Sequence, residues 1–208
     1  PWDAYAKAVK LDGASELIVS QPSYFEAFGK IYKETDLQSW KDYLSIRLVS
    51  EYSGKLSKNF VDRQFDFYGK TLSGTTEQQP RWKKAVNASD EVLGEVAGKL
   101  YVAEHFKPEA KARMEVLVKN LIQAYHDSID TLEWMTPETK KAAHEKLNKF
   151  TPKIGYPDKW KDYSNLSIKA DDLVGNYKAA TAFAYSEMLN KLGKPIDRTE
   201  WFMTPQTV

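Results

Sequence analysis

The sequence contains one histidine–glutamate pair, His144–Glu145, within a lysine-rich stretch that has a helical pattern. Zinc peptidases carry H-E-x-x-H on a helix, where two histidines one turn apart bind the metal and the glutamate activates a water. Here Asn148 occupies the position of the second histidine, and an amide is a weak zinc ligand. We therefore interpret the pair as an exposed helix face and predict no metal ligand there.

The other ionisable candidates have structural explanations. His105 and His126 stand far apart in the sequence, and we assign them structural roles at the surface or half buried. A meeting of the three histidines in space stays open, although no local pattern indicates it. The adjacent carboxylates Asp171 and Asp172 lie where a helix is expected to begin, so favourable interaction with the helix dipole explains them better than acid–base catalysis.

Composition excludes several classes of protein. The 208 residues include no cysteine, which removes disulfides, thiolate nucleophiles and thiolate metal sites. Lys and Arg number 30 against 29 Asp and Glu, and this balance disfavours nucleic acid as a partner. No apolar run approaches the roughly 18 residues of a transmembrane span. With 42% hydrophobic residues the chain can form a core.

Apolar residues recur at helical spacing along most of the chain. We predict a mainly α, multi-helix domain with long amphipathic helices and at most short extended segments near the ends, at 15–20 and 201–208. Prolines, caps and stop signals delimit the expected helices, which cover about 22–32, 36–48, 61–72, 80–105, 108–132, 136–150 and 171–192. The fourth of these is expected to break internally.

Several residues have a predicted packing role. Most of the aromatic side chains lie on the apolar stripes, so we assign them to the core, and Leu147 and Phe150 are expected to face inward. Gly94 and Gly98 are four residues apart, which favours close packing of two helices. Trp160 and Tyr163 follow a loop-forming proline and are expected to pin that loop; exposed recognition groups are the alternative.

Several segments together resemble one family. They occur in the order seen in the neprilysin-like zinc metallopeptidases, peptidase family M13, and the absence of cysteine resembles bacterial oligopeptidases of the PepO type. The segments are Phe65, Phe67, Tyr68, Leu72 and Gly74, then 80–82, 98–102, 134–136 with Thr139 and Lys140, 153–158, Glu200 with Trp201, and 204–208.

The resemblance implies an enzyme of two lobes, of which residues 1–208 form a single helical, non-catalytic, N-terminal lobe. In the family the larger lobe carries H-E-x-x-H, a downstream glutamate ligand and a supporting acid, and none of these is in this sequence. We therefore assign no catalytic residue and no metal ligand to this chain, and its substrate-binding residues are unknown. Zinc is expected in the parent metalloendopeptidase, with none bound by this chain, which alone is expected to be inactive. The starting Pro1-Trp2-Asp3 and the ending at Val208 also suggest a fragment.

The implied role of this lobe is to cap the catalytic lobe and restrict access to an enclosed chamber in which small peptides are hydrolysed. Its expected partners are the catalytic lobe of the same polypeptide and, in the full-length protein, peptide substrates; the isolated fragment is expected to self-associate. A periplasmic or other extracytoplasmic location, with lipid anchoring as one form, is favoured over the cytoplasm. The alternative function is a stand-alone helical interaction or scaffold module without peptidase activity.

Overall fold

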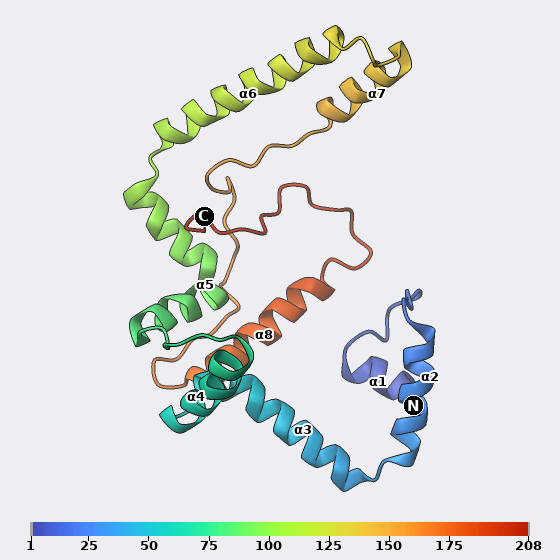
Figure 1. Ribbon diagram of the computed structural model, residues 1–208, viewed down its shortest axis with the longest axis vertical. Helices are drawn as coiled ribbons and strands as arrows, with labels where there is room; N and C mark the ends of the chain where they lie inside the picture. The colour runs from blue at the N-terminus through green and yellow to red at the C-terminus, as the bar shows by residue number, and fades with distance from the viewer. Residues whose placement is uncertain (1, 208) are drawn as a thin grey trace. The chain divides into compact units, whose positions relative to one another are not determined.

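The computed structural model describes residues 2–207 and, over that range, contains helices and no strand (Figure 1). The mainly α fold class predicted from helical spacing is therefore confirmed. The elements are α1 (Trp2–Ala8), α2 (Pro22–Glu34), α3 (Leu37–Tyr52), the 3-10 turn η1 (Ser53–Lys55), α4 (Lys58–Gln64), the π-helix η2 (Phe65–Leu72), α5 (Arg81–His105), α6 (Pro108–Thr131), α7 (Pro137–Asn148) and α8 (Leu173–Leu189).

The chain divides into two compact units. The first comprises residues 1–80 and 164–194, and therefore α1 to η2 together with α8. Within it the ring of Tyr177 on α8 is 7% exposed and lies under the Lys55 ammonium, 4.0 Å from the ring centroid. On the same helix, the hydroxyl of Tyr185 donates to the carbonyl of Val9. The second unit comprises residues 81–163 and 195–208, with α5, α6 and α7.

Local signals set the helix starts. Proline occupies the first turn of α2, α6 and α7, where its missing N–H costs no hydrogen bond. Asp36 caps α3, because its Oδ1 accepts from the backbone N–H of Ser39 at 2.9 Å. The hydroxyl and N–H of Ser39 both stabilise that carboxylate and lower the pKa of Asp36. Thr136 caps α7 through the N–H of Thr139. These starts agree with the sequence prediction.

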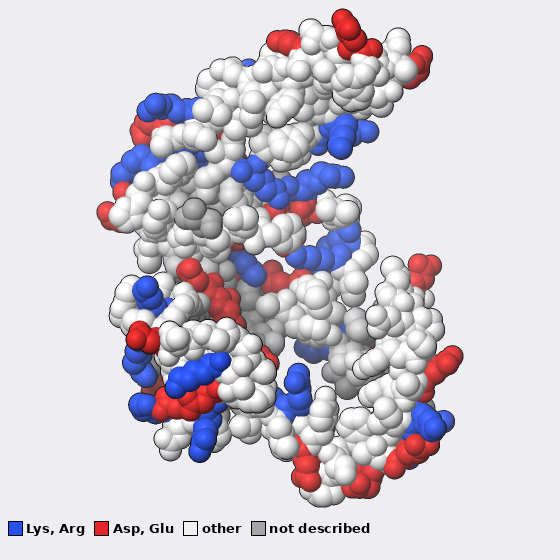
Figure 2. Space-filling model, in the orientation of Figure 1, with Lys and Arg blue, Asp and Glu red and all other residues white. Residues whose placement is uncertain are grey.

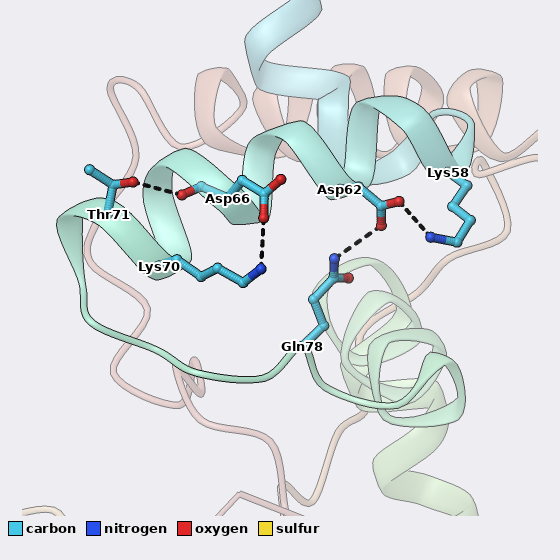
Figure 3. Close-up of polar contacts among 6 residues, drawn as sticks. All are labelled: Lys58, Asp62, Asp66, Lys70, Thr71 and Gln78. Atoms are coloured by element: carbon cyan, nitrogen blue, oxygen red, sulfur yellow. Dashed lines mark hydrogen bonds and ion pairs between the residues drawn. The ribbon is translucent and has the colours of Figure 1, made fainter.

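The expected third helix changes its winding halfway. After α4 the chain continues as the π-helix η2, in which the hydroxyl of Thr71 donates to the carbonyl of Asp66 five residues earlier (Figure 3). The wider turn brings the position of Gly69 against the Phe65 ring, 2.5 Å from where a Cβ would stand. The prediction of one regular α stripe over 61–72 is therefore wrong in its second half.

Both carboxylates of this segment are neutralised nearby. Asp62 accepts from Lys58 at 2.5 Å and from the Gln78 amide at 3.2 Å, while Asp66 accepts from Lys70 at 2.9 Å (Figure 3). The pairs with lysine are one helical turn apart and exposed. Exposed pairs one helical turn apart are typical of a solvated helix face.

The expected break within α5 occurs at Leu93, whose φ of −127° and ψ of 32° are not helical. Helix α8 ends at Leu189, three residues earlier than predicted, and a turn leads to Gly193 with a left-handed φ of +71°.

The apolar stripes do not form a core among the described residues. Ala6 and Tyr177 are the buried hydrophobic side chains of residues 2–207. The predicted inward side chain Phe150 is 61% exposed, which corrects that assignment. The apolar stripe of α2 is 41–61% exposed in its members Tyr24, Phe25, Phe28, Ile31 and Tyr32. The apolar stripe of α6 is 42–56% exposed in its members Met114, Leu117, Leu121 and Tyr125. Their covering surfaces are not provided by the described residues.

The two adjacent aspartates at the start of α8 provide a matched test of helix capping. The Oδ1 atom of Asp172 accepts from the N–H of Gly175 at 2.8 Å, and Asp171 precedes this cap. We expect Asp172→Ala to destabilise α8 by about 1 kcal/mol, because an N–H at the helix start loses its acceptor. Hydrogen exchange of the 173–180 amides measures this loss. Asp171→Ala is the control, and equal effects of the two changes would contradict the capping assignment.

Candidate functional site

The hairpin of α6 and α7 brings together two histidines and a carboxylate. The Nδ1 atoms of His126 on α6 and His144 on α7 lie 2.7 Å apart, and the planes of the two rings are 5° apart. The Nε2 atom of His144 lies 2.8 Å from Oδ1 of Asp130. The prediction of an exposed face at His144 is therefore wrong in part, because its side chain is 26% exposed and bonded on both nitrogens. Asp130 stands four residues after His126, so both side chains lie on one face of α6, but nothing in the local sequence indicates His144 as their common partner.

These residues do not fit a catalytic zinc. Such a site needs three protein ligands that converge on one point and leave a position for water. Here the two facing imidazole nitrogens bond to each other and the carboxylate occupies the far nitrogen of one ring. Within residues 2–207 no group of three or more His, Cys, Asp or Glu side chains is arranged to hold a metal.

The remaining residues of the His-Glu motif lie apart from any such centre. Glu145 and Asn148 are exposed on α7. His105, at the end of α5, packs its ring against Tyr101 with centroids 4.9 Å apart. The structure thus brings His126 and His144 together and leaves His105 with an aromatic neighbour on its own helix.

A second cluster joins the 153–160 loop to α6. The ammonium of Lys111 donates to the carbonyl of Tyr156 at 2.9 Å and to Oδ1 of Asp158 at 2.6 Å, and lies 4.4 Å from the Tyr156 ring centroid. The Lys111 side chain is only 13% exposed, whereas that of Asp158 is 96% exposed. At Gly155, whose φ is +72°, the Phe106 ring occupies the space that a Cβ would need.

The aromatic residues of this loop are held in place. Trp160 stacks on Tyr156 with ring planes 6° apart and is half buried. The backbone N–H of Lys161 donates to Oε2 of Glu95 on α5 at 2.6 Å. Burial raises the pKa of the neighbouring Tyr163 above that of an ordinary phenol. These contacts support the predicted pinning role of Trp160 and Tyr163.

The glycine pair of α5 receives the C-terminal segment. A Cβ on Gly94 would stand 2.6 Å from the Thr204 methyl, and one on Gly98 would stand 2.7 Å from Cδ of Pro205. The amide of Gln206 donates to the carbonyl of Gly94 at 2.9 Å and to Asp90 at 2.7 Å. The prediction that these glycines pack two helices together is wrong: their partner is a non-helical segment.

The surface offers no single-sign field on the face drawn in Figure 2, where basic and acidic side chains are interspersed. Among the helices of residues 2–207, none has a stretch long and apolar enough to cross a bilayer.

The sequence matches the model of a known protein family and is similar to several characterised proteins. The model of peptidase family M13 matches residues 1–157. Neprilysin-2 of Drosophila melanogaster is 33% identical over 96% of this chain and 29% of its own length, and human neprilysin is 26% identical over 93% and 27%. The chain therefore spans less than a third of the length of these relatives.

Solved structures give the same correspondence. The zinc metalloprotease Zmp1 of Mycobacterium tuberculosis in its open state aligns with a TM-score of 0.89 and 44% identity, over 100% of this chain and 32% of that protein. PepO from Lactobacillus rhamnosis aligns with a TM-score of 0.72 and 26% identity, over 81% and 27%.

We expect Gly98→Ala to loosen the C-terminal segment. The added methyl would collide with the rigid Pro205 ring, which must move away. Alanine favours a helix by about 1 kcal/mol over glycine, so a net loss of protection identifies the collision. Gly29→Ala on α2 is the control, because beyond its chain neighbours and its own helix backbone nothing lies within 4 Å of the added methyl. Hydrogen exchange of residues 200–207 should become faster in Gly98→Ala and stay the same in Gly29→Ala. Unchanged exchange in Gly98→Ala would contradict the close contact between the C-terminal segment and α5.

We expect Lys111→Met to release the 153–160 loop, because the Tyr156 carbonyl loses its donor at a cost of about 1–3 kcal/mol. Asp158→Asn should cost less than about 1 kcal/mol, because that carboxylate is exposed and Lys111 keeps its other contacts. Proteolysis within the loop and hydrogen exchange of 153–161 measure the difference. An effect of Asp158→Asn equal to that of Lys111→Met would show that the ion pair, and not the buried amine, holds the loop.

Proposed function

This chain belongs to peptidase family M13, and from that membership we propose that it is the non-catalytic helical lobe of a longer zinc metalloendopeptidase. The observation that carries the proposal is the alignment of the whole chain with about a third of a zinc metalloprotease, at 44% identity. Residues 1–208 together are proposed to form this one lobe.

The exposed apolar faces support a role that requires further protein. Isolated helices in water are marginal, and an amphipathic helix gains most of its stability by covering its apolar face. Leu117 and Leu121 on α6 are 54% and 50% exposed, and Phe25 and Ile31 on α2 are similarly open. We propose that the remainder of the polypeptide covers such faces, and that the isolated chain self-associates through them.

The chemistry of the enzyme is proposed to reside outside this chain. When bound, zinc would supply a polarised water for attack on a peptide carbonyl. The described residues do not fit that metal, since the His126–His144 pair is closed by its own hydrogen bond. The part played by this chain is therefore one of shape and exclusion.

Rigid walls suit that role. Helix α6 has 24 residues and a length of about 36 Å. Lys111 near its start anchors the 153–160 loop, and the α7 hairpin returns along its other end. We propose that this framework limits access to a chamber formed with the catalytic lobe, so that short peptides enter and folded proteins do not.

A stand-alone scaffold is the second candidate, and the exposed apolar faces also favour it. The gene distinguishes the two. A reading frame that continues into H-E-x-x-H supports the peptidase lobe, and one that stops near Val208 supports the scaffold.

The assignment of zinc to other residues predicts that the histidines of this chain are dispensable for metal binding. We expect the full-length gene product carrying His105→Gln, His126→Gln and His144→Gln to keep stoichiometric zinc, measured by mass spectrometry on the folded fraction from gel filtration. Its hydrolysis of a short fluorogenic peptide is also expected to persist. Loss of zinc from the folded variant would place a metal ligand in this chain and overturn the proposal.

A further inference from the structure

In the α6–α7 hairpin, the hydrogen bond between the imidazole rings of His126 and His144 depends on which ring nitrogens carry a proton. A carboxylate can only accept, so Nε2 of His144 must carry the hydrogen that Asp130 receives. In neutral His144 the Nδ1 atom is then an acceptor, and Nδ1 of His126 is the donor across the 2.7 Å contact.

The number of bound protons decides whether this contact persists. One additional proton is tolerated: a charged His144 donates from both nitrogens, to Asp130 and to His126, provided that His126 then carries its proton on Nε2. A second proton leaves two N–H groups facing each other 2.7 Å apart, with two positive charges and no acceptor between them. The contact cannot exist in that state.

The charged groups around the pair do not compensate for the second proton. Along the chain, the charged residues within four positions of either histidine are Asp127 and Asp130 on α6 and Lys140, Lys141, Glu145 and Lys146 on α7. Of the carboxylates, Asp130 bonds to the pair, whereas Asp127 accepts from Gln123. The Lys140 ammonium lies 2.7 Å from the Asp130 carbonyl and adds positive charge beside the pair.

From this geometry we propose that His126, His144 and Asp130 form an acid-released latch between α6 and α7. The latch is closed while at least one imidazole is uncharged, and it opens as the pH falls far enough to charge both rings. Histidine is the side chain whose charge normally changes between pH 5 and 8, so this is the range in which the latch is tested. Opening removes the histidine contact between α7 and α6 and so loosens α7, which precedes the segment that leads to the Lys111-bound loop.

Hydrogen exchange of the full-length protein between pH 7.5 and pH 5, corrected for the pH dependence of intrinsic exchange, tests the latch. The protection of residues 137–148 is expected to fall by roughly tenfold or more on acidification, the loss that accompanies a broken hydrogen bond involving charge. Protection in α7 that is constant over this range would overturn the proposal.

Two variants separate the latch from general acid sensitivity. In His126→Gln the amide can still donate to His144 but cannot be charged, so the acid-induced loss of α7 protection should disappear; His105→Gln is the matched control and should retain it. In Asp130→Asn the anion that supports a charged His144 is removed, so the loss should occur at a lower pH. A fall in His126→Gln equal to that of the wild type, or an unchanged midpoint in Asp130→Asn, would refute the mechanism.

Discussion

The main physical constraint on this chain is that the apolar faces of its helices need to be covered. Its helices are long and amphipathic, but each unit folds back on itself too little to bury their stripes. On the helices of residues 2–207, Tyr177 and Ala6 are the buried apolar side chains. Surface of this kind costs free energy in water unless other protein covers it. The chain spans less than a third of the length of its M13 relatives, and much of its apolar helix surface is uncovered.

Within the second unit, hydrogen bonds from polar side chains and close approach at glycines hold the irregular segments in place. Lys111 and Gln206 each donate a hydrogen bond to a backbone carbonyl, and Glu95 accepts one from the backbone N–H of Lys161. Gly94 and Gly98 have no side chain, which lets a non-helical segment approach α5 closely. Such contacts satisfy backbone groups that no helix or sheet would pair. They give loops a defined course with little burial of apolar surface.

The ionisable groups fit the same picture. Carboxylates such as Asp62 and Asp66 are paired with lysines one turn away, and Asp36 and Asp172 serve helix starts. Hydrogen bonds and ion pairs of this kind are those of helix caps and solvated helix faces. The histidine pair differs because its partners come from two helices and its bonding changes with protonation. Its consequence is mechanical, since it joins α7 to α6.

The sequence by itself determined the features that depend on neighbours within a few residues. These are the α class, the prolines and caps that begin α2, α3, α6 and α7, the presence of a break within α5 and the family to which the segments belong. Tertiary structure decided the rest, because the partners are distant: His144 lies 18 residues from His126, and Gln206 lies 112 residues from Gly94. An apolar stripe specifies that a face needs covering, but the identity of the covering surface, a helix, a loop or another part of the polypeptide, is set by contacts that local periodicity does not encode.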